Sequence, residues 1–149
     1  VNLVETIASR CLKSNIFLDA SKKSEVINYL IEDRSLQNLF DFNENLSPGQ
    51  FLKFNEIYFK YKIHQNDNIF IILNTLVNGY KKEKDKSLIN LVYFLIDDFF
   101  FHKIKDNVNK IEFLLHSKSS LIKIINNFVL FNLNINLVLN SIKINLKDV

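Results

Sequence analysis

The stretch from Leu88 to about Lys105 constrains the fold more than any other part of this sequence. Its apolar residues form two stripes at helical spacing, and together the stripes cover most of the circumference of the predicted helix. One stripe consists of Leu88, Leu91, Val92, Leu95 and Phe99, and the other consists of Ile89, Tyr93, Ile96 and Phe100. A helix that is apolar on most sides is buried among other elements. The sequence therefore predicts a helical domain with this helix at its centre.

Apolar residues spaced three and four apart predict further helices on both sides of the central one. We expect them at about 21–32, from Ser47 or Pro48 to about 62, and at 69–77, 111–115, 121–128 and 135–146. A shorter helix around Leu36 to Phe40 and a brief extended segment at 15–18 are also expected. The chain holds only two glycines and one proline, which leaves little material for turn-dense β structure. The predicted fold class is mainly α, with a β remnant at the N-terminus.

Polar residues indicate where several of these helices begin and where the chain divides. Asp19 or Ser21 is expected to cap the first helix, and Ser47 with Pro48 is a favourable opening for a later one. The polar segment 65–68 is the expected hinge between two helical units. The charged stretch 81–86 is interpreted as a solvated loop or helix end.

Composition and motif spacing exclude several classes of protein. The net charge of +3 is too small to indicate a dedicated nucleic-acid module, and the single Cys11 allows no disulfide framework. No apolar run approaches the roughly 20 residues of a membrane span, so we expect a cytoplasmic protein without membrane contact. No phosphate-binding glycine motif occurs, and Asp97 and Asp98 are too close in sequence to serve as an acid/base pair. The three histidines have no helical metal-site spacing and are expected at the surface; they are His64, His102 and His116.

The segment Thr6-Ile7-Ala8-Ser9-Arg10-Cys11 resembles the end of the AAA+ core in subunits of bacterial DNA polymerase III clamp loaders. That family commonly has a proline before the threonine, where this chain has Glu5. The resemblance implies that Arg10 is an arginine finger that reaches ATP-Mg held by a neighbouring subunit, with Thr6, Ser9 and Cys11 as supporting motif residues. A planar, permanently charged guanidinium suits the charge that develops on the γ-phosphate.

A second segment, Leu46 to Leu52, contains Ser47-Pro48-Gly49 and resembles the opening of the last lid helix in delta-prime-like subunits. ATP-hydrolysing relatives of the gamma and tau type carry a sensor 2 arginine near this place, where this chain has Gly49. The resemblance therefore favours the non-hydrolysing delta-prime type and implies no cofactor bound by this segment itself.

A third segment, Asn132 to Leu139, resembles the opening of the final collar helix in the same family. Its characteristic positions are Asn132, Asn134 and Leu137. Asn134 is the expected N-cap of this helix, and the helix's apolar faces are expected to pack within the collar and against neighbouring subunits.

The three resemblances together imply a domain order and a function. The end of an AAA+ core is expected at 1–11, a three-helix lid at 12–63 and an all-α collar for oligomerisation at 66–149, with a nucleotide-binding-type core preceding residue 1. The chain would have no enzyme activity alone and would act with gamma or tau and delta subunits, placing a sliding clamp on primed DNA. An ATP-binding gamma or tau subunit is one alternative. An unrelated all-α interaction module is the other.

Overall fold

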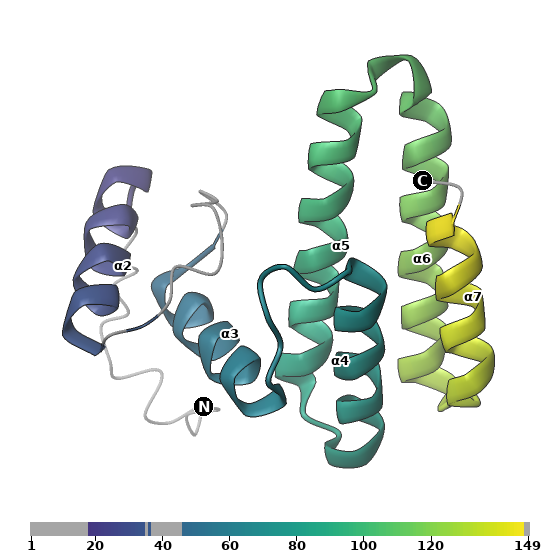
Figure 1. The fold of residues 1–149 in the computed structure, drawn as a ribbon, viewed down its shortest axis with the longest axis horizontal. Helices are drawn as coiled ribbons and strands as arrows, with labels where there is room; N and C mark the ends of the chain where they lie inside the picture. The colour runs from purple at the N-terminus through teal and green to yellow at the C-terminus, as the bar shows by residue number, and fades with distance from the viewer. Residues whose placement is uncertain (1–17, 35, 37–45, 148–149) are drawn as a thin grey trace, which may run out of the picture. The chain divides into compact units, whose positions relative to one another are not determined.

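The computed structural model describes residues 18–34, 36 and 46–147, and Figure 1 shows that this part of the chain is almost entirely helical. Its elements are α2 (Ala20–Arg34), α3 (Pro48–Tyr61), α4 (Ile69–Glu83), α5 (Lys86–Asp106), the 3₁₀ helix η1 (Val108–Lys110), α6 (Ile111–Phe131) and α7 (Ile135–Lys147). The described ranges contain no strand, so the mainly α prediction is confirmed for them. The expected extended segment at 15–18 and the short helix ending at Phe40 fall largely outside these ranges.

The chain divides into two compact units, 1–48 and 49–149. In the first unit the structure describes mainly α2, which begins as the sequence predicts. The Asp19 carboxylate accepts a hydrogen bond from the backbone N–H of Lys22 at 2.8 Å, and Ile27 is buried. Because α3 belongs to the second unit, the expected hinge at 65–68 lies inside that unit. The division into a lid at 12–63 and a collar at 66–149 stays a prediction.

In the second unit, α4 to α7 form an up-and-down bundle joined by short turns (Figure 1). Helix α4 contacts α5 and α7, and α6 contacts the same two helices, so each helix has two neighbours. Helices α5 and α6 each have 21 residues, against 15 in α4 and 13 in α7. At 1.5 Å per residue, the α5–α6 pair therefore extends roughly 10 Å beyond its partners.

Helix α5 contributes more buried residues than any other helix of the bundle, as predicted for a helix that is apolar on most sides. Its buried side chains come from both predicted apolar stripes, and the other helices contribute one face each. The fully buried residues of the bundle include Leu73, Leu76 and Val77 of α4, Leu88, Leu91, Ile96 and Phe100 of α5, Leu121, Ile125 and Phe128 of α6, and Ile142 of α7. Burying such side chains is the main free-energy gain that holds amphipathic helices together.

Helix α6 corrects the prediction of two short helices at 111–115 and 121–128. The polar residues 116–120 suggested an interruption, but the helix continues through them without a break. Leu114, Leu121 and Ile125 share one buried face, and Ser117 lies on that face with 6% of its surface exposed. Serine does not break a helix as proline does, so packing of this face decides the outcome. Helix α4 is also longer than predicted, because it continues through Gly79 to Glu83.

Helix α3 packs against the bundle through aromatic side chains. Phe51, Phe54 and Tyr58 are each at most 5% exposed, and the ring of Phe54 lies 5.4 Å from the ring of Phe94 in α5. The helix begins at Pro48, as predicted, and Lys62 in the left-handed conformation terminates it. Aromatic residues at helical spacing are therefore core residues here.

Candidate interaction surfaces

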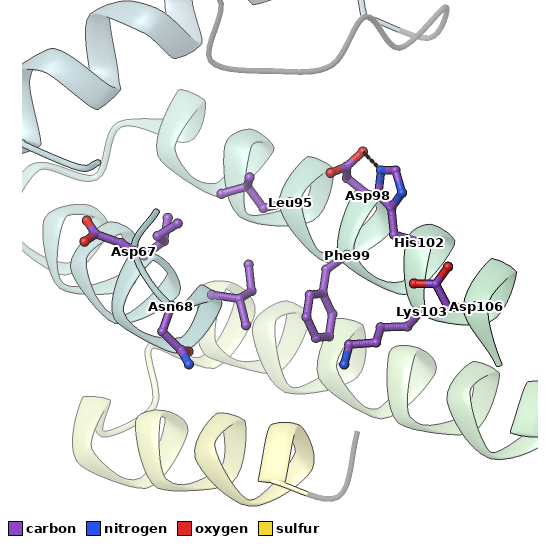
Figure 2. Close-up of a pocket in the computed structure, with 10 residues that line it drawn as sticks. Asp67, Asn68, Leu95, Asp98, Phe99, His102, Lys103 and Asp106 are labelled. Carbon is purple, nitrogen blue, oxygen red and sulfur yellow. Dashed lines mark ion pairs between the residues drawn. The ribbon is translucent and has the colours of Figure 1, made fainter. Parts of the chain in front are cut away.

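A groove lies between the N-terminal end of α4 and the C-terminal half of α5 (Figure 2). Its volume is about 390 Å³, and its floor is apolar, with Leu95 and Phe99 on the α5 side. The remaining lining residues are Asp67, Asn68, Ile69, Ile72, Asp98, His102, Lys103 and Asp106. This is the range of volume in which proteins bind a small molecule or a large side chain.

The rim of the groove is acidic. Asp98, His102 and Asp106 are four residues apart on α5 and therefore lie along one side of the helix. The Oδ1 atom of Asp98 lies 3.6 Å from Nε2 of His102. Asp67 accepts a hydrogen bond from the backbone N–H of His64 at 2.8 Å. Lys103 is the one ammonium group in the lining, with its Nζ atom 5.5 Å from the Phe99 ring centre.

The pKa of a neighbouring tyrosine reports the same negative charge. Burial raises the pKa of Tyr58 to about 12, and the carboxylates of Asp98 and Asp67 add to the shift. Both effects oppose formation of the phenolate. The groove therefore offers an apolar floor beneath a rim that favours cations.

A second surface lies where α6 turns into α7, and we call it the α6–α7 corner. Its apolar residues are exposed: Leu130 by 74%, Phe131 by 70%, Leu133 by 40% and Leu137 by 67%. All four belong to the eight residues 130–137, which span the turn between the two helices. A cluster of exposed apolar side chains is typical of a surface that another molecule covers.

Two asparagines build this corner. Asn132 ends α6 in the left-handed conformation, with φ of 50°, which asparagine tolerates better than most residues. Asn134 accepts a hydrogen bond from the backbone N–H of Asn136 at 2.9 Å, which confirms its predicted role as the N-cap of α7.

Two lysines from the end of α4 reach the corner. The Nζ atoms of Lys81 and Lys84 donate hydrogen bonds to the side-chain oxygen of Asn132, at 2.8 and 3.0 Å. Lys84 is itself the left-handed residue that ends α4. Because the shared acceptor is a neutral amide, these contacts position two positive charges without neutralising them.

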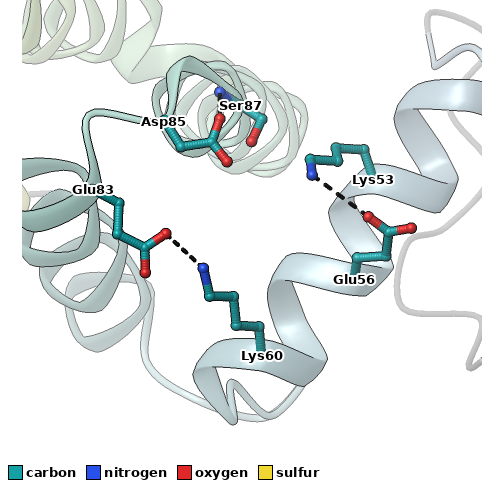
Figure 3. Close-up of polar contacts among 6 residues, drawn as sticks. All are labelled: Lys53, Glu56, Lys60, Glu83, Asp85 and Ser87. Carbon is teal, nitrogen blue, oxygen red and sulfur yellow. Dashed lines mark hydrogen bonds and ion pairs between the residues drawn. The ribbon is translucent and has the colours of Figure 1, made fainter.

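The two carboxylates nearest in sequence to these lysines, Glu83 and Asp85, are engaged elsewhere (Figure 3). Glu83 pairs with Lys60 of α3 at 2.5 Å, and their hydrogen bond lowers the pKa of Glu83 and raises the pKa of Lys60. Asp85 accepts a hydrogen bond from the backbone N–H of Ser87 and caps α5. The Ser87 side chain, and after it this backbone contact, lower the pKa of Asp85. The Lys60–Glu83 pair thus attaches α3 to the C-terminal end of α4, and the engagement of both carboxylates leaves the corner basic.

The outer face of α7 continues the corner along the bundle. Leu137 and Ile144 are seven residues apart and are 67% and 65% exposed, whereas Val138 and Ile142 on the other side are buried. A spacing of seven places Leu137 and Ile144 on one line along the helix. Helix α7 therefore has one apolar face toward the bundle and a second apolar line toward the outside.

No family model, curated protein or solved structure matches this chain. The structure itself shows where each predicted site residue lies. Asn132, Asn134 and Leu137 come together at the corner. Arg10 and the rest of its motif, Thr6, Ser9 and Cys11, lie outside the described residues, so their expected role stays a prediction.

The lid motif is within the described range. Gly49 is exposed on the first turn of α3, between Pro48 and Gln50, and a Cβ built on it would meet no atom within 4 Å. The packing at this site therefore leaves room for a larger side chain. The choice of glycine over arginine here is not explained by crowding.

Histidines and acidic side chains are the remaining candidates for chemistry in the described ranges. His64, His102 and His116 are exposed, as predicted. Across residues 18–34, 36 and 46–147, no three His, Cys, Asp or Glu side chains are placed to hold a metal ion. Within the same ranges, no helix is both long and apolar enough to cross a membrane.

Sequence reasoning missed the acidic groove and the two lysines of the corner. The spacing of Asp98, His102 and Asp106 was visible in the sequence as a polar stripe on the central helix. The groove itself depends on how α4 crosses α5, and the contacts of Lys81 and Lys84 join residues about 50 positions apart. A local sequence pattern does not predict contacts between residues so far apart in the chain.

Proposed function

We propose that this chain is the C-terminal part of a delta-prime-like clamp-loader subunit and that its bundle joins it to neighbouring subunits through the α6–α7 corner. The observation that carries the proposal is the exposure of Leu137. This residue belongs to the segment that resembles the final collar helix, and it faces away from the bundle core. A leucine that contacts a neighbouring subunit must be exposed on its own subunit, as Leu137 is.

The proposed partners are gamma or tau and delta subunits, and the assembly would place a sliding clamp on primed DNA at the expense of ATP. Arg10 would act on ATP-Mg bound by a neighbour, and this chain would contribute no cofactor. The resemblance of three sequence segments, in the order that the family has them, supports this part of the proposal.

The test is co-assembly of the whole subunit with gamma or tau and delta subunits of the same organism. We expect Leu137→Glu to weaken assembly at least about tenfold, because the change would bury a charge in an apolar contact. Val108→Glu is the matched control, since Val108 is 68% exposed at the other end of the bundle and should tolerate the same charge. Equal assembly of both variants with the wild-type partners would refute the role of the corner.

Arg10→Ala tests the catalytic part of the proposal separately. The variant should assemble normally and lower the DNA- and clamp-stimulated ATPase of the complex by about 10³-fold or more at the dependent site. An unchanged ATPase in an assembled complex would reject the role of Arg10.

A further inference from the structure

Helix α4 has an apolar surface near each of its ends. Acidic residues border one of these surfaces, and lysines border the other. The groove lies at the N-terminal end of α4 beside Asp67, and the α6–α7 corner lies at its C-terminal end beside Lys81 and Lys84. No charged residue occurs between Ile69 and Tyr80. The helix has 15 residues and is therefore about 22 Å long. The groove and the corner of one copy are too far apart to contact each other.

The corner has the chemistry that the groove would bind. The groove has an apolar floor and carboxylates from Asp67, Asp98 and Asp106 at its rim. The corner presents Phe131, which is 70% exposed, near two ammonium groups that share only a neutral acceptor. A groove of about 390 Å³ has room for one phenylalanine side chain and part of a neighbouring leucine.

The charge around the groove differs from that of the unit to which it belongs. Residues 49–149 contain 14 lysines and nine acidic residues, and three of those nine line the groove. Lys103 and His102 are the basic side chains in the lining, and each lies beside a group of α5 itself, Phe99 and Asp98. The rim is thus an acidic site within a basic unit, which favours contact with the basic end of another copy.

We propose that copies of this chain associate head to tail, with the α6–α7 corner of one copy in the α4–α5 groove of the next. Phe131 occupies the apolar floor, and Lys81 and Lys84 face Asp98 and Asp106. Because the two surfaces differ, the contact is heterologous and repeats from copy to copy, closing into a ring or continuing as an open chain. The contact uses the α6–α7 corner that the proposed function assigns to neighbouring subunits, so the two contacts exclude each other on one copy, and self-association is expected of the free chain.

Sedimentation velocity on the 149-residue chain tests the proposal without any other subunit. We expect the average mass to rise above the 17.6 kDa of one copy at concentrations on the order of 10–100 µM, as for a small, charged contact. The association should weaken at about 0.5 M salt, because the ion pairs are near the surface. A wild-type chain that stays monomeric up to about 1 mM would overturn the proposal.

Charge exchange identifies the two surfaces. One variant reverses the groove, Asp98→Lys with Asp106→Lys, and the other reverses the corner, Lys81→Glu with Lys84→Glu. Each alone should associate at least about tenfold more weakly than the wild type. An equimolar mixture should regain association, because the intact corner of the groove variant meets the intact groove of the corner variant, and the reversed corner meets the reversed groove. A mixture that stays monomeric while the wild type associates would refute this pairing.

Two controls make the exchange specific. Lys123→Glu with Lys143→Glu makes the same charge change as the corner variant on exposed positions outside both surfaces, and it should associate like the wild type. If this control also dissociates, the overall charge governs association and the proposal fails. A second groove variant, Asp98→Asn with Asp106→Asn, introduces no cation and should also weaken association; wild-type association of this variant in its folded form would exclude the groove.

Discussion

Gly79 should respond to alanine substitution in a way that an isolated helix would not. A Cβ at this position would lie 2.7 Å from Cε1 of Tyr61 and 2.8 Å from its Cζ and Oη atoms. Ordinary contact begins near 3.4 Å, so the ring must move by roughly 0.7 Å. In a helix interior, replacing glycine by alanine stabilises by about 1 kcal/mol, whereas forced overpacking costs about 1–3 kcal/mol. We therefore expect Gly79→Ala to change the free energy of unfolding by between about zero and 2 kcal/mol, in the destabilising direction.

A double-mutant cycle separates the two effects. In a Tyr61→Ala background the ring is absent, and Gly79→Ala should stabilise by about 1 kcal/mol. The coupling between the two positions should then be about 1–3 kcal/mol. Urea unfolding followed by circular dichroism gives each free energy, and equal m-values would show that the unfolded states are comparable. Stabilisation by about 1 kcal/mol in both backgrounds would refute the contact between Tyr61 and α4.

Two further changes test the groove region and the corner. Because the folded pKa of Tyr58 is about 12 and the ordinary value is about 10, the unfolded chain loses this proton first as the pH rises. Its contribution to stability is therefore complete below pH 10 and falls by up to roughly 3 kcal/mol between pH 10 and 12. Tyr58→Phe should flatten that fall in urea titrations at several pH values, and an equally steep fall would contradict the assignment. Asn134→Ala should destabilise the chain by about 1 kcal/mol through loss of the α7 cap, while Asn134→Ser should restore most of it; equal stability of both variants would exclude the cap.

The sequence predicted the helices of the second unit well where one apolar face continues without interruption. Helices α5 and α7 follow their stripes to within a few residues, because packing of these stripes stabilises them. Helix α6 was divided wrongly because its polar residues 116–120 were given more weight than the shared face of Leu114 and Leu121. Serine and lysine are tolerated in a helix whose other side is buried. The helical spacing of the apolar residues therefore predicts α6 better than its polar residues do.

The candidate surfaces were predicted only where local structure determines them. The cap at Asn134 follows from residue type and from the helix that comes after it. The exposure of Leu137 does not, because a leucine at helical spacing reads as core unless the position of α6 and α4 is known. The groove required the same knowledge, since its walls come from two helices. Local patterns thus indicated the helix ends, and tertiary packing determined which apolar residues stay outside.

Helix dipoles explain part of the charge pattern but not the part that lines the groove. An acid at the start of a helix and lysines at its end are each stabilising by about 0.3–1 kcal/mol, which accounts for Asp67 and Lys84 around α4. Asp106 is the last residue of α5, where a negative charge opposes the dipole, and Asp98 lies in the middle of the helix, where the dipole has little effect. Local helix stability therefore does not favour Asp106, and for Asp98 it offers only the i, i+4 pair with His102. A contact that brings cations to the groove supplies a reason for both, and the charge-exchange experiment tests that reason directly.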